Sequence, residues 1–280
     1  EGSEEVGLRL RIEIVGRVVE SEVARVGLLE SLPRVQQMFL GDRIADFRGV
    51  GFRPVLADPA GKTLGFHQRE RDLYRRHYGT PPERLHLLPP GIARDRLAPP
   101  DARQIGCGLR RELGIPEDHH LLLMVGSGFR TKGVDRTLRA VAALPADLRP
   151  RTRLVIIGHD NFEPFRRLAR RLGVLERLHF FHGRPDIPRF LFAADLLLHP
   201  AYRETAGAVL LEALAAGLPV LASDVCGFSY HVERAQAGRL IPSPFDQAAF
   251  SAIELSAPLP PLPDDYPADD LAAYLLFYYQ

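Results

Sequence analysis

Two glutamates, Glu204 and Glu212, lie eight residues apart in a segment with helical periodicity from Thr205 to Ala216. On one helix this spacing corresponds to about 80° around the axis and about 12 Å along it. Glu204 would then stand at the helix start and Glu212 two turns further in. The backbone N–H groups of 205–207 would lie at the positive end of the helix, where a diphosphate could bind.

The chemistry expected of this pair is recognition of a nucleotide sugar. Glu204 could accept hydrogen bonds from sugar hydroxyls on one side of the diphosphate, and Glu212 from ribose hydroxyls on the other. Alternatively, each is an ordinary helix charge. For Glu212 this alternative is disfavoured, because the run 213–220 is largely apolar and a carboxylate there is costly without a partner.

A second candidate is the glycine-rich segment 126–133, between an apolar run and a helical pattern. Glycines such as Gly126 let a backbone approach an anion closely, and the segment would bring Arg130 and Lys132 to that anion. It matches neither the dinucleotide fingerprint nor the P-loop. A flexible loop that presents cations and an ordinary glycine-rich turn are equally compatible with the sequence.

Other polar residues near the ends of apolar runs are weaker candidates. Asp186 is expected to cap the helix that follows it, and the turn around Arg184 could instead present its backbone to a base. His199, at a strand end, could line the cleft, but such a histidine is more often a hydrogen-bonded residue behind the site. Neither the histidines nor Cys107 and Cys226 have metal-ligand spacing, so no metal site is expected.

The elements that must position these residues alternate regularly. Short, nearly continuous apolar runs, typical of parallel strands buried on both faces, occupy 121–125, 154–157, 178–181, 196–198 and 220–222. Helical patterns between them cover 134–144, 162–172, 187–194 and 205–216. This alternation predicts a doubly wound α/β sheet whose ligand binds at the carboxyl ends of the strands.

The flanks are less regular. We expect a strand over 8–14, a helix over 20–32, a connector over 53–66, a helix-compatible run over 68–78, a short strand over 85–88 and a linker over 95–103. Prolines exclude helix interior from 257–263.

Composition limits the classes of partner and compartment. The formal net charge of +1 argues against a general nucleic-acid binder. No apolar run reaches the roughly 18 residues that a membrane-spanning helix needs, and the acidic start lacks the features of a signal peptide. With only two distant cysteines, these features predict a cytoplasmic protein, and leave room for a peripheral contact at the inner face of the cytoplasmic membrane.

Three motifs carry a family resemblance. Gly-Ser-x4-Lys-Gly-Val-Asp at 126–135, Glu-x7-Glu at 204–212 and Glu-Ala-x-Ala-x-Gly-x-Pro-Val at 212–220 resemble the family 4 retaining glycosyltransferases of the GT-B fold. The resemblance covers about 70–245 and is strongest to the members that add glucose to the inner-core heptose of lipopolysaccharide.

The resemblance implies UDP-glucose as donor, no required metal or cofactor, retention of configuration and a lipopolysaccharide inner-core acceptor. By analogy, the catalytic residues are Glu204, which contacts the glucose, and Lys132 and Arg96, which face the diphosphate. The other donor contacts implied are Gly126 and Arg130 in the glycine-rich segment, Arg184 at the uracil, backbone of Ala206, Gly207, Ala208 and Val209 at the phosphates, and Glu212 at the ribose.

The expected organisation has three parts: a truncated or divergent amino-terminal acceptor-side region over 1–98, a Rossmann-like UDP-sugar-binding domain over 99–245, and a proline-rich tail over 246–280. Because 1–60 do not resemble the family's first domain, a nucleotide-sugar-binding half-enzyme with little transfer activity is the alternative to a competent transferase. A phosphorylase of the same fold would need a lysine for pyridoxal phosphate, and neither Lys62 nor Lys132, the only lysines, has the expected setting.

Overall fold

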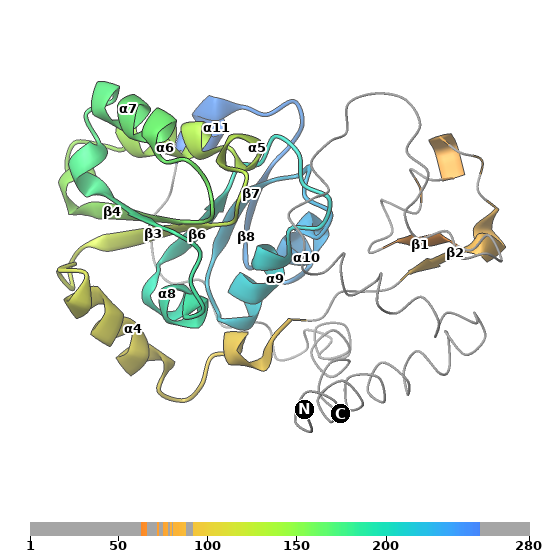
Figure 1. Cartoon of the computed structure of the whole chain (residues 1–280), viewed down its shortest axis with the longest axis horizontal. Coiled ribbons are helices and arrows are strands. Elements are labelled where there is room, and N and C mark those ends of the chain that lie inside the picture. Colours follow the sequence, from red (N-terminus) through yellow and green to blue (C-terminus); the bar gives the residue numbers. More distant parts are fainter. Residues whose placement is uncertain are drawn as a thin grey trace, which may run out of the picture. The chain divides into compact units, whose positions relative to one another are not determined.

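The computed structural model describes residues 63–65, 72, 75–77, 79, 81–87 and 92–252 (Figure 1). The chain divides into two compact units, one of residues 1–93 with 267–280 and the other of residues 94–266. The boundary expected after residue 98 falls a few residues beyond this division. The strand over 8–14, the helix over 20–32 and the prolines of 257–263 lie outside the described residues.

The second unit is built on a six-stranded sheet in which all strands are parallel. The strands are β3 (His120–Val125), β4 (Thr152–Ile157), β5 (Leu178–Phe181), β6 (Leu196–His199), β7 (Val220–Ser223) and β8 (Gly238–Ile241). Their order in the sheet is β5-β4-β3-β6-β7-β8. This confirms the doubly wound parallel sheet, and the order reverses between β3 and β6, where such sheets bind ligands.

Helices cover both faces of this sheet (Figure 1). One face carries α4 (Ala102–Glu112), α8 (Ile187–Ala193), α9 (Ala208–Ala215) and α10 (Ser229–Arg234), and the other carries α5 (Phe129–Lys132), α6 (Val134–Ala142), α7 (Glu163–Arg171) and α11 (Gln247–Ser251). Single 3-10 turns form at η3 (Arg94–Arg96), η4 (Arg149–Arg151) and η5 (Leu175–Arg177).

Some predicted elements need correction. The sequence predicts strands β3 to β7 within two residues of their bounds. It does not predict β8, because Gly238 and Arg239 in that strand are exposed and interrupt the apolar run. The segment 95–103 is not a plain linker, since it holds part of η3 and the start of α4.

The start of α9 is the correction that matters most for the site. The helix begins at Ala208, not at Thr205, because Gly207 has φ +81°, a left-handed conformation that ends the regular helix. Glu204 therefore lies in the loop before α9, and only Glu212 is helical. The expected placement of both glutamates on one helix is wrong.

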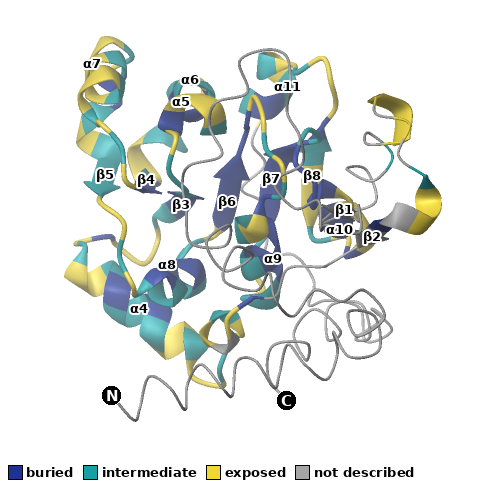
Figure 2. Cartoon of the chain, turned by 45° about the vertical axis from the view of Figure 1, so that its right-hand side comes forward, coloured by how far each residue is buried: buried dark blue, intermediate teal, exposed yellow. Residues whose placement is uncertain are grey.

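The central strands form the core. Figure 2 shows β6 and β7 buried between the helices, and their residues from Leu196 to His199 and from Val220 to Ser223 are all buried. Phe250 of α11 is fully buried in the same core as residues of β3, β4 and α6. The sheet domain therefore continues past residue 245, where the sequence pattern ended it.

In the first unit, β1 (Thr63–Gly65) pairs in parallel with β2 (Leu85–Leu87). The 3-10 turn η2 (Pro82–Arg84) directly precedes β2 in the chain. The short strand expected over 85–88 is confirmed, whereas β1 lies in the segment expected to be a connector. Of the run 68–78, the described residues 72 and 75–77 are helical.

Candidate functional site

Two loops meet at the point where the strand order reverses. Residues 126–133 follow β3, residues 200–207 follow β6, and these strands are neighbours in the sheet. The Tyr202 amide donates to the Thr131 carbonyl at 2.8 Å. A Cβ on Gly133 would lie 2.1 Å from the Pro200 carbonyl oxygen, so only glycine allows this approach. The sheet topology thus places both candidate segments of the sequence at the carboxyl ends of neighbouring strands.

An arginine that the sequence patterns did not single out fastens the second loop. Arg136 of α6 donates from Nη1 to the carbonyls of Pro200 and Ala201, both at 3.1 Å. Its guanidinium carbon lies 3.5 Å from the ring centroid of Tyr202 and 3.7 Å from that of Phe245. These contacts fix the loop backbone just before Glu204.

The glycine-rich segment is held from its other side by the loop after β4. Ser127 Oγ accepts from the His159 amide at 3.1 Å, and the Phe129 amide donates to Asp160 Oδ2 at 2.7 Å. Residues 129–132 form the short helix α5, so the segment is anchored at this side, whichever of the two alternatives left open by the sequence applies to it.

The two cations of this segment behave differently. A Cβ on Gly126 would lie 3.5 Å from Lys132 Cε, so the lysine stem runs over the glycine toward the second loop. Arg130 is exposed. The structure brings Lys132 into the site and leaves Arg130 at its surface.

Lys132, Glu204 and His199 form a buried polar cluster. The Lys132 ammonium donates to Glu204 Oε2, and His199 Nε2 lies 3.2 Å from the same oxygen. The His199 side chain is 1% exposed, and those of Glu204 and Lys132 are 11% and 22% exposed. Burial alone would raise the pKa of Glu204, but the hydrogen bond from His199 and the charge of Lys132 outweigh it and lower that pKa to about 2. Glu204 is therefore an anion fixed by two donors.

The backbone beside this cluster opens α9. Ala208 and Val209 are its first residues, after Gly207 as N-cap, and the first N–H groups of a helix have no partner within it. The Ala206 carbonyl accepts from the Phe228 amide at 2.8 Å, which anchors the loop. The expected phosphate-binding backbone thus follows Glu204 directly.

Glu212 lies in a second cluster, with Arg96. Arg96 Nε is 3.5 Å from Glu212 Oε2, and Arg96 Nη1 is 2.7 Å from Asp95 Oδ2. Burial raises the pKa of Glu212, the charge of Arg96 lowers it, and that of Asp95 raises it, with a net upward shift. Glu212 is thus partnered rather than a solvated helix charge. The charged neighbours of Arg96 are both carboxylates, and its contact with a diphosphate remains a prediction.

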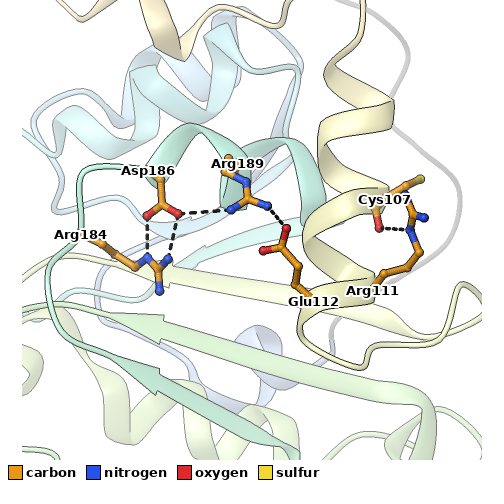
Figure 3. A network of polar contacts seen from close by, with 6 residues as sticks. All are labelled: Cys107, Arg111, Glu112, Arg184, Asp186 and Arg189. Atoms are coloured by element: carbon orange, nitrogen blue, oxygen red, sulfur yellow. Dashed lines mark hydrogen bonds and ion pairs between the residues drawn. The ribbon is translucent and has the colours of Figure 1, made fainter.

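Arg184 belongs to a third cluster, between β5 and α8 (Figure 3). Its Nε and Nη2 donate to the two Asp186 oxygens at 2.6 and 2.8 Å, which lowers the pKa of Asp186. Arg189 links Asp186 to Glu112 of α4. Asp186 occupies the N-cap position of α8, but its side chain makes no capping hydrogen bond, because it binds Arg184 instead. The assignment of Arg184 to the uracil remains a prediction.

Comparison with known proteins gives the family. The family model described as glycosyl transferases group 1 matches residues 108–256, which is more than half of the chain. The chain belongs to this family. The matched range contains Lys132, Glu204 and Glu212, and it extends past residue 245 as the sheet domain does.

Relatives agree with this assignment. Lipopolysaccharide glucosyltransferase WaaG of Escherichia coli is 48% identical over 183 residues, which are 64% of this chain and 48% of that protein. D-inositol 3-phosphate glycosyltransferase of Streptomyces scabiei is 35% identical over 190 residues, 64% of this chain and 42% of the other. The chain thus spans about half the length of the curated relatives it matches.

A solved structure supports the same likeness. The crystal structure of WaaG, a glycosyltransferase involved in lipopolysaccharide biosynthesis, matches with a TM-score of 0.65 at 46% identity, over 68% of this chain and 51% of that one. Anabaena HepE in complex with UDP and glucose, at 23% identity and a TM-score of 0.58 over 68% of this chain and 51% of that one, shares the fold. The resemblance to lipopolysaccharide core glucosyltransferases and the GT-B-like fold are confirmed.

Two features bear on whether this group 1 glycosyltransferase binds a metal or spans a membrane. In the part of the chain that the structure describes, no group of three or more His, Cys, Asp or Glu residues could hold a metal ion. Within the same part, no helix is long and apolar enough to cross a membrane. Cys107 and Cys226 are free thiols.

Proposed function

We propose that the second unit binds UDP-glucose at the carboxyl edge of its sheet, and that the protein transfers the glucose, with retention of configuration, to a heptose of the lipopolysaccharide core. The observation that carries this proposal is the Lys132–Glu204 pair beside the start of α9. It places a cation for a diphosphate and a carboxylate for sugar hydroxyls next to each other. The 48% identity to WaaG supports glucose as the sugar and the lipopolysaccharide core as acceptor.

In this proposal, catalysis rests on stabilising the leaving group. Breaking the bond between glucose and phosphate leaves negative charge on UDP. The Lys132 ammonium and the N–H groups of Ala208 and Val209 are preorganised positive charge at that place, so no metal is needed. Arg130, which is exposed on the same segment, adds a second cation. Arg96 either reaches the diphosphate or orients Glu212 at the ribose.

The acceptor part of the proposal is open to a direct alternative. Because the chain matches about half of its relatives' length, the second candidate is a nucleotide-sugar-binding unit with little transfer activity. The expected acceptor is anchored in a membrane by its lipid, so we expect the protein to work at the inner face of the cytoplasmic membrane through a peripheral contact.

Calorimetric titration of the chain with UDP, UDP-glucose and UDP-galactose tests the donor site. We expect UDP-glucose to bind at least tenfold more tightly than UDP-galactose. Absence of binding by all three compounds would refute the proposal. Incubation with UDP-glucose and glucose-free inner-core lipopolysaccharide then separates the two candidates: an α-linked glucose in the product supports the transferase, and binding without transfer supports the binding unit.

A further inference from the structure

His199 is a polar residue in an otherwise apolar position. It ends β6, a central strand that pairs with β3 and β7, after Leu196, Leu197 and Leu198. Its side chain is almost completely buried, and its Nδ1 has no hydrogen-bond partner in the described part of the chain. A leucine would fill such a position without burying an unpartnered polar atom. The one hydrogen bond of the imidazole goes to Glu204.

The direction of this hydrogen bond follows from the charge of its partner. Glu204 is ionised, and an ionised carboxylate can only accept hydrogen bonds. His199 Nε2 must therefore carry a proton and donate it to Oε2, the oxygen that also receives the Lys132 ammonium. Both donors hold one oxygen, and Oε1 takes part in neither contact.

We propose that His199 is a positioning residue for the donor site: it anchors Glu204 Oε2 so that Oε1 faces the sugar of the bound nucleotide. The proposal rests on the proposed function, in which Glu204 contacts the sugar and Lys132 the diphosphate. A bound diphosphate competes with Glu204 for the Lys132 ammonium. His199 then remains as the donor that keeps the carboxylate oriented, because its own position is fixed by the buried end of a strand that is paired on both sides.

Two substitutions with similar chemistry separate this role from simple packing. In His199→Gln the side-chain amide nitrogen can reach the position of Nε2 and donate to Glu204. In His199→Asn the amide nitrogen reaches only the position of Nδ1 and cannot. Both place an amide at the end of β6, so a loss of packing affects both, and a loss of the contact with Glu204 affects only His199→Asn.

The experiment measures the affinities of UDP and UDP-glucose by calorimetry, for the full chain and for His199→Asn, His199→Gln, Glu204→Gln and the double variant His199→Asn with Glu204→Gln. The readout is the affinity for UDP-glucose relative to that for UDP. We expect this ratio to fall about tenfold in His199→Asn and in Glu204→Gln, and to stay within threefold of the unmodified chain in His199→Gln. In the double variant it should fall no further than in Glu204→Gln.

Three results would overturn the inference: equal losses in His199→Asn and His199→Gln, an unchanged ratio in His199→Asn, or losses that multiply in the double variant. Each means that His199 does not act through Glu204, and none touches the proposed function as long as the unmodified chain binds UDP-glucose. If the unmodified chain binds neither compound, the proposed function fails first, and the two failures are thereby distinguished.

Discussion

The Lys132 ammonium and the Glu204 carboxylate form an ion pair at the point where the strand order of the sheet reverses. Lys132 ends the short helix α5 and Glu204 lies in the loop after β6, 72 residues apart in the chain. In the proposed function one of them binds the diphosphate and the other binds the sugar. Without ligand each neutralises the other, so donor binding must exchange this contact for contacts with the nucleotide sugar.

The first prediction follows from that exchange. Glu204→Gln should strengthen binding of UDP, which carries no glucose for Glu204 to contact, because Lys132 no longer has a carboxylate partner. We expect about a fivefold gain, equivalent to about 1 kcal/mol. Calorimetry with UDP measures it, and Glu163→Gln, an exposed carboxylate on α7, is the control. Weaker UDP binding by Glu204→Gln would mean that Lys132 does not contact the diphosphate.

Removal of the Glu212 carboxylate should change the affinity for UDP in the opposite direction. Glu212→Ala is expected to weaken UDP binding by about 1–3 kcal/mol, the cost of losing a charged hydrogen-bond partner of the ribose. UDP-glucose should lose the same amount, because both ligands carry the ribose. A loss confined to UDP-glucose would place Glu212 at the sugar rather than at the ribose.

The free energy of unfolding should depend on pH, and ionisation of Glu204 should contribute to that dependence. Its pKa in the folded protein, about 2, is below the ordinary value of 4.5. The ionised group therefore stabilises the fold above about pH 4.5, and this contribution is lost as the pH falls toward 2. In Glu204→Gln, the difference in unfolding free energy between pH 7 and pH 2 should shrink by roughly 3 kcal/mol.

Chemical denaturation across that pH range measures the effect, and Glu212→Gln is an informative comparison. Burial raises the pKa of Glu212 above its ordinary value of 4.5, so its ionisation destabilises the fold as the pH rises from about 4.5 to the raised pKa. Glu212→Gln should therefore increase stability at neutral pH, whereas Glu204→Gln should decrease it. The same sign for both variants would contradict the assigned environments.

Most of the sheet could be predicted from the sequence, because strands buried on both faces are continuous apolar runs. Strand β8 and the start of α9 could not. Strand β8 carries exposed residues. The start of α9 depends on the left-handed conformation of Gly207, which a glycine can adopt but does not have to adopt. Glu204 was consequently expected on a helix with Glu212, and the structure instead gives each carboxylate its own cation.

The site residues could be predicted where a motif marks them, and not where only the fold unites them. Lys132, Glu204 and Glu212 stand in recognisable spacings. Arg136 has no spacing that relates it to Pro200, 64 residues away, and the two meet only because β3 and β6 are neighbours in the sheet. His199 was visible as a polar residue at a strand end, but its contact with Glu204 depends on how the loop after β6 returns.

Metal independence is a further prediction. The proposed leaving group is stabilised by Lys132 and by the backbone at the start of α9. The affinity for UDP, measured by calorimetry, should therefore be the same within twofold in EDTA and in magnesium. Magnesium-dependent binding, lost on chelation, would show that the diphosphate site has been assigned to the wrong groups.

The last prediction concerns Arg136, whose guanidinium lies between the rings of Tyr202 and Phe245 and donates to two carbonyls of the loop that carries Glu204. Lysine keeps the charge but lacks the planar group that stacks and donates twice. Arg136→Lys should therefore lower the unfolding free energy by roughly 2 kcal/mol.

The same variant should weaken UDP-glucose binding more than UDP binding, because the loop that it loosens positions the carboxylate at the sugar. Denaturant unfolding and calorimetry provide the two measurements. Arg139→Lys, an exposed position on the same helix, is the matched control and should change neither quantity. If Arg136→Lys destabilises the fold but weakens binding of UDP and of UDP-glucose equally, the contacts of Arg136 support the carboxyl edge of the sheet as a whole and do not position Glu204 in particular.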